Sequence, residues 1–381
     1  MTKISFLYAA LLLAANTLSA QQKALPLIKA DSLLVSIRDN DILRKDAWTI
    51  SPETKPDVYT TAVPKKSKQV TFYTDQDSIT VTVKPNSCVL FNILLKGKDT
   101  ALTGVYAYDT LATLKKAGKY NLAEKQELPA FTYQSAEDSN LTALRKTYHL
   151  DSIAGQGSEV SRIMNLMHWI HGLVPHDGSH GNPEVRNAMN MIEVCRKDKR
   201  GLNCRGLAMA LNECYLSLGI PSRYVTCLPK DSLGIDNDCH VINMVYVSGL
   251  KKWIWIDPTF DAYVMNEKGE LLGIEEVRAR IIDGRPLILN PDANWNRRSS
   301  QTKEGYLYSY MAKNLYMLEC SVHSGFDTET TKPGKQITYI RLIPLDYFKK
   351  SLEKSVSTNK VTKTSYITFR TNNPAAFWRA P

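Results

Sequence analysis

The stretch from Arg200 to Leu218 constrains the fold of this chain most, because it places a cysteine at the start of a long helix with an apolar face. Apolar side chains recur there at the spacing of an amphipathic helix: Leu207, Leu211, Cys214 and Leu218. Gly219 follows, and glycine readily takes the left-handed conformation that ends a helix. The pattern predicts a helix that begins near Cys204 and packs one face against a core.

The residues after this helix change to an alternating pattern that indicates β-strands. Three strands are expected, over residues 222–227, 240–247 and 252–257. His240 opens the second of them and Asp257 ends the third. A helix that carries a cysteine and is followed by antiparallel strands predicts an α+β core.

Further elements surround this core on both sides in the sequence. Helical periodicity predicts a helix over 158–173, and Asn182 with Pro183 is typical of an N-cap and first-turn pair that starts another. Later helices are expected over 273–282 and 306–318, and strands over 337–343 and 365–370.

The first 130 residues differ in character from the rest. Residues 69–108 contain short β-type runs separated by turn residues, which predicts a β-sandwich-like module over 67–130. Residues 21–66 are expected to form an N-terminal extension, with a short helix at Asp31–Lys45 and an extended connector over 51–68. The remaining residues, 131–381, then form the second domain with its C-terminal helix and strand extension.

Residues 1–20 have the pattern of a secretory signal peptide. Lys3 precedes an apolar run over 4–15, and small residues lead to Ala20, while the run is too short to span a membrane. We therefore expect export to the periplasm or the extracellular space, without stable membrane insertion after cleavage. In such a compartment seven cysteines allow three disulfides and one free thiol, and Cys227 with Cys239 is one candidate pair.

The bulk composition excludes few classes of function. At 381 residues the chain is long enough for two domains, and 43% hydrophobic with 23% charged residues is ordinary for a globular protein. The net charge is +10, but the lysines and arginines are scattered and no nucleic-acid-binding motif accompanies them. We expect no nucleic-acid partner.

Cys204 is the strongest candidate for a nucleophile. Unpaired backbone N–H groups at a helix start favour a thiolate over a thiol. Buried cysteines are common, however, so this position alone does not indicate catalysis. Adjacent strands bring His240 and Asp257 together, which supplies a base and a carboxylate that orients it.

These three residues and their surroundings resemble the transglutaminase-like superfamily of papain-type thiol enzymes. The matching segments are GLNCRGLAMALNECYLSLGIPSRYV, the strand that begins at His240, and WIWIDPT, which together span roughly Glu159–Tyr263. One departure is that the family usually has glycine two residues before the cysteine, whereas here Gly201 stands three before it and Asn203 intervenes.

The resemblance implies an active site without a cofactor. Cys204 would be the nucleophile, His240 the base and Asp257 the group that sets the imidazole tautomer. The Cys204 backbone N–H and a second, upstream donor would bind the oxyanion. Trp169 and His176 are the two candidates for that donor, although Trp169 is also expected as a core residue of its helix.

A cluster of histidines precedes the cysteine. His168 and His171 are three residues apart on a predicted helix, and His176 and His180 follow, so a zinc site is conceivable. No carboxylate or cysteine stands at the accompanying ligand spacing, and we expect no metal.

Two functional hypotheses remain from the sequence. The first is an exported thiol hydrolase or acyltransferase that acts on peptide, protein or cell-wall amides, with hydrolysis favoured over cross-linking because no calcium-binding loop is recognisable. The second is a non-catalytic protein that uses the same fold and the β-domain to bind a glycan, a peptide or a partner. An intact set of Cys204, His240 and Asp257 favours the first.

Overall fold

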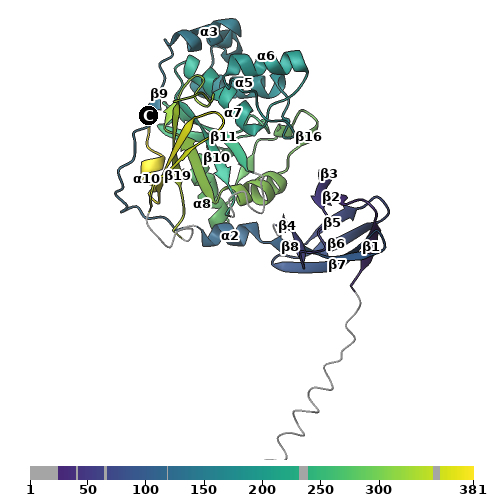
Figure 1. Ribbon diagram of the computed structural model, residues 1–381. Helices are drawn as coiled ribbons and strands as arrows, with labels where there is room; N and C mark the ends of the chain where they lie inside the picture. Colours follow the sequence, from purple (N-terminus) through teal and green to yellow (C-terminus); the bar gives the residue numbers. More distant parts are fainter. Residues whose placement is uncertain (1–24, 40–41, 64–66, 118, 231–238, 346–351) are drawn as a thin grey trace, which may run out of the picture. The chain divides into compact units, whose positions relative to one another are not determined.

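The computed structural model describes residues 25–381 except 40–41, 64–66, 118, 231–238 and 346–351 (Figure 1). The chain divides into two compact units, residues 1–108 and 109–381. The expected signal peptide, residues 1–20, lies outside the described residues. We describe each unit by itself.

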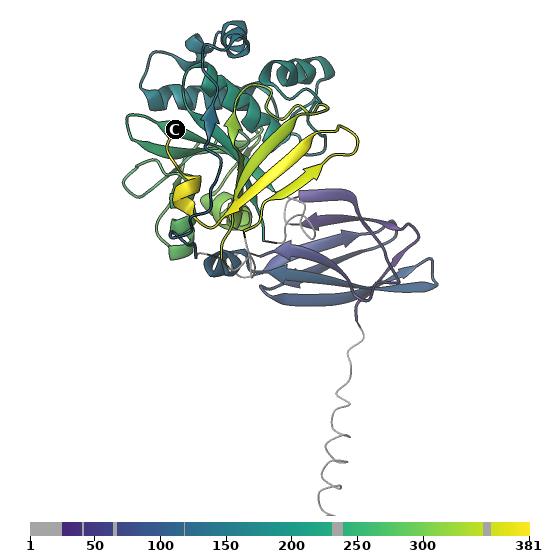
Figure 2. The ribbon, with the colours of Figure 1, turned by 60° about the vertical axis from the view of Figure 1, so that its left-hand side comes forward.

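The first unit is built of two four-stranded sheets that share one core (Figure 2). One sheet has the order β1 (Leu27–Ala30), β7 (Ser87–Leu95), β8 (Asp99–Tyr108), β4 (Asp57–Ala62). The other has the order β3 (Ile42–Thr49), β2 (Leu34–Asp39), β5 (Lys68–Tyr73), β6 (Ser78–Val83). Phe72 and Phe91 meet between the sheets with ring centroids 5.1 Å apart. This arrangement is a β-sandwich.

The prediction of a helix at Asp31–Lys45 is wrong, because strand β2 and the start of strand β3 lie in this segment. The side chains of β2 alternate: Val35 and Ile37 are buried, whereas Leu34 and Arg38 are exposed, which is the period of a strand. The connector expected over 51–68 likewise contains β4. The boundary between the units falls after Tyr108, whereas the sequence suggested residue 130 and left 21–66 outside the strand-rich module.

The second unit is organised around a seven-stranded sheet. Its order is β12 (Lys252–Ile256), β11 (His240–Val247), β10 (Ser222–Leu228), β17 (Met317–Ser321), β19 (Gln336–Leu342), β21 (Ser365–Thr371), β20 (Ser355–Thr358). Neighbouring strands are antiparallel except β19 and β21. The strands expected over 222–227, 240–247 and 252–257 are confirmed within one residue at their ends.

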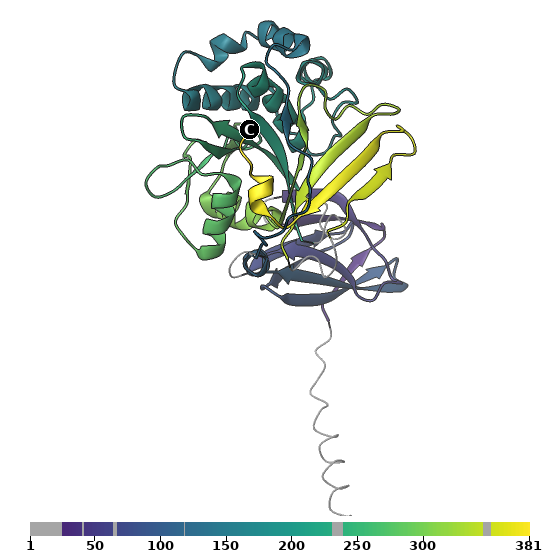
Figure 3. The same ribbon diagram turned by 90° about the vertical axis from the view of Figure 1, so that its left-hand side faces the viewer.

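Helices cover both faces of this sheet with separate apolar cores (Figures 1 and 3). One face packs against α3 (Ser139–Thr147), α4 (Leu150–Ala154), α5 (Glu159–Leu173), α6 (Ala188–Asp198) and α7 (Cys204–Ser217). The other packs against α2 (Thr110–Lys116), α8 (Ile274–Asp283), the π-helix η1 (Glu304–Met311) and α10 (Pro374–Phe377). The α+β class expected from the sequence is confirmed.

Two helices of this unit differ from the expectation. The helix expected over 306–318 ends at Asn314 with α9 (Ala312–Asn314), and Met317 begins β17, the central strand of the sheet. A strand that is buried along its whole length shows no alternation, so periodicity cannot separate it from a buried helix. The helix expected to start at Asn182 begins at Ala188, because Asn187 caps it by accepting a hydrogen bond from the Asn190 N–H.

Candidate active site

The turn that leads into α7 is held by a pair of asparagines. Asn203 is the N-cap, and its side-chain oxygen accepts a hydrogen bond from the Gly206 N–H at 3.2 Å. The Asn182 side chain donates to the same oxygen at 2.7 Å. A Cβ at Gly206 would lie 2.5 Å from the Asn182 oxygen, so a larger residue here would displace the Asn182 side chain. Asn182 thus supports the turn before Cys204 and does not cap α6.

Gly201, at the beginning of the turn that leads to Cys204, is also required by a close contact. A Cβ there would lie 2.3 Å from the backbone oxygen of Pro175. This close approach lets Leu202 pair with the segment around His176, since the Leu202 N–H donates to Pro175 at 3.1 Å and its carbonyl accepts from Asp177 at 2.7 Å. The departure of the turn from the family pattern therefore coincides with a backbone pairing that brings His176 beside the cysteine.

His240 and Asp257 meet on neighbouring strands. The Nε2 of His240 lies 2.7 Å from Oδ2 of Asp257, and both side chains are fully buried. An ionised carboxylate can only accept, so Nε2 carries the proton and Nδ1 is left as the basic nitrogen. The geometry sets the tautomer that a general base requires.

Two further groups hydrogen-bond to the Asp257 carboxylate, and a third supports one of them. The Thr259 N–H donates to Oδ1 at 2.9 Å and the Tyr306 hydroxyl donates to Oδ2 at 2.5 Å. The indole N–H of Trp255 in turn donates to the Tyr306 oxygen at 3.1 Å. Tyr306 comes from η1, and single turns of π-helix occur often at functional sites. The carboxylate is therefore held from two sides before it orients His240.

Cys204 is the first residue of α7, and its side chain is close enough to those of His176 and His240 to interact with both. Burial opposes ionisation, but the interactions with these two histidines prevail and lower the pKa of Cys204 to about 6. Burial also opposes protonation of His240, but Asp257 and Cys204 together raise the pKa of His240 to about 10. Between these values the pair is a thiolate and an imidazolium.

The structure also defines the tautomer of His176. The indole N–H of Trp295 lies 3.2 Å from His176 Nδ1, and because indole can only donate, Nδ1 is the acceptor. Neutral His176 then carries its proton on Nε2. The backbone of His176 is fixed by two hydrogen bonds to the side chain of Asn296, at 2.6 and 2.9 Å. His176 is thus a positioned N–H donor beside Cys204.

Trp169, the other candidate for the oxyanion donor, packs its ring against Tyr148 with centroids 5.6 Å apart, at the margin of the core that α5 covers. This contact is the core packing that was the alternative expectation for Trp169. The remaining histidines of the predicted cluster take separate partners: His168 contacts Asp261, His171 contacts the Pro258 carbonyl, and His180 contacts Asp177.

All seven cysteines lie among the described residues, and none of them forms a disulfide there. The pair expected between Cys227 and Cys239 is therefore not bonded in the structure. The two cysteines still lie close enough to interact. Burial raises the pKa of Cys227 most, and the charges of Asp257 and Cys239 raise it further.

Sequence reasoning missed several residues of the site. Tyr306 and Trp295 lie well after Asp257 in the sequence, and neither belongs to a motif. Asn182 was assigned to a helix cap because Asn-Pro is a common helix start. Only the tertiary contacts identify these side chains as supports of Cys204, His176 and Asp257.

Comparison with known families identifies part of the second unit. Residues 146–258 match the model of the transglutaminase-like superfamily. No curated protein matches the chain.

The solved structures to which the chain is similar include a Cytophaga hutchinsonii protein described as a "putative cysteine protease". The match has 16% identity and a TM-score of 0.25, and it covers 51% of this chain and 58% of that one. Red sea bream transglutaminase is similar at 14% identity with a TM-score of 0.23, covering 65% of this chain and 51% of that one. The chain thus spans little more than half the length of these neighbours. The segment 146–258, which carries Cys204, His240 and Asp257, is a transglutaminase-like domain.

Proposed function

We propose that this protein is an exported thiol hydrolase or acyltransferase that acts on peptide or carboxamide bonds through a thioester on Cys204. One observation carries the proposal. The Cys204 thiol at the start of α7 lies within interaction range of His240, whose Nε2 hydrogen-bonds to Asp257 at 2.7 Å. A nucleophile, a base and a group that orients the base are the parts that acyl transfer requires.

The first half of the reaction forms the acyl-enzyme. The Cys204 thiolate attacks the carbonyl carbon of the amide, and the carbonyl oxygen takes the negative charge. The backbone N–H of Cys204 and the Nε2–H of His176 are the donors that we propose for that oxygen, because donation by the Trp295 indole leaves the His176 proton on Nε2 and His176 interacts with Cys204. His240 then gives its Nδ1 proton to the leaving nitrogen, the C–N bond breaks, and an amine departs.

The second half regenerates the thiol. Neutral His240 takes a proton from water, and the resulting hydroxide attacks the thioester carbon. The C–S bond breaks, a carboxylic acid leaves and the imidazolium again faces a thiolate. An amine in place of water would give a new amide. We favour water because the sequence contains no recognisable calcium-binding loop and because an exported enzyme works in a dilute medium.

The proposed substrates are peptides, proteins or cell-wall amides, and the proposed location is the periplasm or the extracellular space. Export rests on the pattern of residues 1–20 alone. Within the described residues, none of the helices has the length and apolar character needed to cross a bilayer.

The decisive experiment compares two cysteine variants. Wild type, Cys204→Ala and Cys214→Ala would be incubated with casein and peptide pools, and acyl groups on cysteine would be detected by mass spectrometry after rapid acid quench. We expect turnover and a thioester on Cys204 in the wild type and in Cys214→Ala, and neither in Cys204→Ala. Equal, background-level turnover in all three proteins would contradict the proposal and leave the non-catalytic binding protein.

A further inference from the structure

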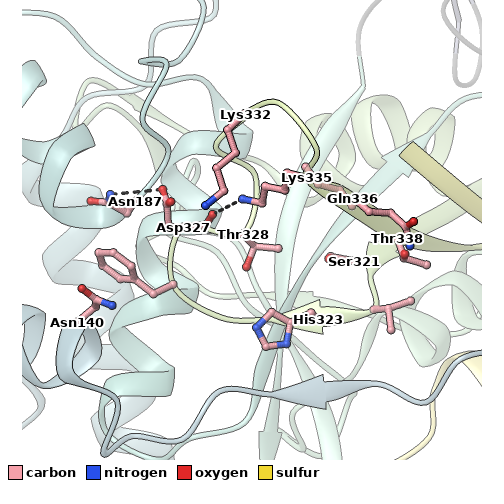
Figure 4. A pocket seen from close by; sticks show the side chains of 13 residues that line it. Asn140, Asn187, Ser321, His323, Asp327, Thr328, Lys332, Lys335, Gln336 and Thr338 are labelled. Carbon is pink, nitrogen blue, oxygen red and sulfur yellow. Dashed lines mark hydrogen bonds between the residues drawn. The ribbon is translucent and has the colours of Figure 1, made fainter. Parts of the chain in front are cut away.

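A second pocket lies in the same unit and shares no residue with the site at Cys204. It has a volume of about 530 Å³ and is lined by the start of α3, the cap of α6, the end of β17, β18 (His323–Ser324), the following loop and the start of β19 (Figure 4). A volume of this size suits a small organic molecule, since pockets of roughly 300–1,000 Å³ are usual for such ligands.

Hydrogen-bond donors dominate the polar lining. Lys332 and Lys335 reach the pocket from the loop, and Figure 4 shows their side chains extending toward Asp327 and Thr328. His323 lies at the opposite side, where burial and then the charge of Lys335 lower its pKa. The lining therefore contains two ammonium groups and one carboxylate, and this excess of positive charge favours the binding of an anion.

The carboxylate that lines this pocket belongs to Asp327, and one of its oxygens already accepts hydrogen bonds within the protein. Oδ1 of Asp327 accepts hydrogen bonds from the Thr330 hydroxyl and from the Asn187 amide. The ammonium of Lys335 donates to the carbonyl oxygens of Asp327 and Thr330, each at 2.8 Å. Asp327 thus shapes the loop, while Lys332 is exposed to solvent at the mouth of the pocket.

The loop that forms this wall is anchored firmly. Glu329 is buried and accepts hydrogen bonds from Arg205, from the Tyr224 hydroxyl at 3.1 Å and from the Tyr339 hydroxyl at 3.0 Å. Arg205 directly follows Cys204 in the sequence. A pocket whose wall is ordered before a ligand arrives loses less conformational entropy on binding.

The remaining lining is apolar or uncharged. Phe326, Val322 and Ile337 supply apolar surface, and the side chains of Asn140 and Gln336 can bond to an amide. From this combination we propose that the pocket binds a small carboxylate that carries a short amide-containing tail, such as a dipeptide with a free C-terminal carboxylate, with Lys332 at the carboxylate.

The test measures binding in the Cys204→Ala background, so that it does not depend on turnover. Isothermal titration calorimetry would compare N-acetyl-Ala-Ala with its C-terminal amide and with inorganic phosphate. We expect the free acid to bind about threefold to tenfold more tightly than the amide and more tightly than phosphate. Lys332→Gln should weaken binding of the acid about threefold to fivefold, since one exposed charge contributes roughly 1 kcal/mol or less.

Two controls make the result decisive. Lys360→Gln removes an exposed lysine that does not line the pocket and should leave the affinity unchanged. Gln336→Ala, an exposed change in the wall, should weaken the dipeptide but not phosphate. The proposal is overturned if acid and amide bind equally, if phosphate binds and the dipeptide does not, or if Lys332→Gln and Lys360→Gln behave alike.

Discussion

Helix α7 carries two cysteines in opposite environments. Cys204 stands in its first turn between two histidines, and its pKa is lowered to about 6. Cys214 stands in the middle of the same helix, where burial and then the neighbouring Glu213 raise its pKa. Cys214 is fully buried and Cys204 half-buried, but burial raises the pKa of either thiol, so the lower pKa of Cys204 comes from its partners. The comparison teaches that the first turn of α7 stabilises a thiolate, whereas its middle packs in the core.

The largest expected effect is that removal of His240 makes Cys204 resemble Cys214. His240→Ala should lower kcat/KM roughly 10³-fold or more, because the imidazolium that stabilises the thiolate and protonates the leaving group is lost. Turnover measured on the substrate found with wild type tests this. His149→Asn, an exposed histidine in a left-handed turn, is the matched control and should stay within about twofold.

The two thiols should also differ in reactivity toward iodoacetamide. At pH 7 we expect Cys204 to be alkylated at least about 100-fold faster than Cys214, since the thiolate is the reactive form. The rate at Cys204 should fall as the pH drops below about 6, where that thiolate takes up a proton. Peptide mapping by mass spectrometry gives both rates, and a Cys204 profile with a midpoint near pH 9 would refute the comparison.

A smaller effect is expected when the second histidine loses its orientation. Trp295→Phe removes the indole N–H that holds His176 Nδ1, so the His176 proton is no longer directed to Nε2. We expect alkylation of Cys204 at pH 6.5 to slow by about fivefold, with little change at pH 9 where the thiol ionises unaided. A uniform loss at both pH values would indicate a general structural defect.

Loss of one hydrogen bond to Asp257 should be milder still. Tyr306→Phe removes the hydroxyl that donates to Oδ2, while His240 and the Thr259 N–H still hold the carboxylate. We expect kcat to fall about threefold with KM unchanged, since a net hydrogen bond contributes roughly 0.5–1 kcal/mol. Tyr308→Phe, in the same helix and half-buried, serves as control.

The middle of α7 should respond to pH through stability rather than turnover. Glu213 accepts from the N–H groups of Ala188 and Asp327, and burial raises its pKa to about 8. A raised folded-state pKa stabilises the fold below the unfolded value of 4.5, and this contribution is lost as the pH rises through about 8. Wild type should lose about 3 °C or more in Tm between pH 7 and 9, and Glu213→Gln should lose less.

Much of the candidate site around Cys204 can be predicted from local sequence patterns. The apolar period placed Cys204 at a helix start, and the change to alternation placed His240 and Asp257 at the ends of neighbouring strands. These features depend on residues close in the sequence, so periodicity is sufficient to find them.

Other elements could not be found in this way. The segment 31–45 has mixed polarity that fits a short helix, but its strands form through pairing of β2 with β5 and of β3 with β2. Met317–Ser321 is buried on both faces in the centre of the sheet, where no alternation remains to be seen. Secondary structure in both segments follows from distant partners.

The sequence by itself determined the nucleophile candidate, its base and the carboxylate beside that base, because these residues lie on regular elements with strong periodic signals. Only the tertiary structure brought His176 to Cys204 and Tyr306 to Asp257. It also formed the pocket between α3, α6 and β19. The physical reason is that hydrogen bonds and pockets between segments far apart in the chain depend on packing, which no local pattern records.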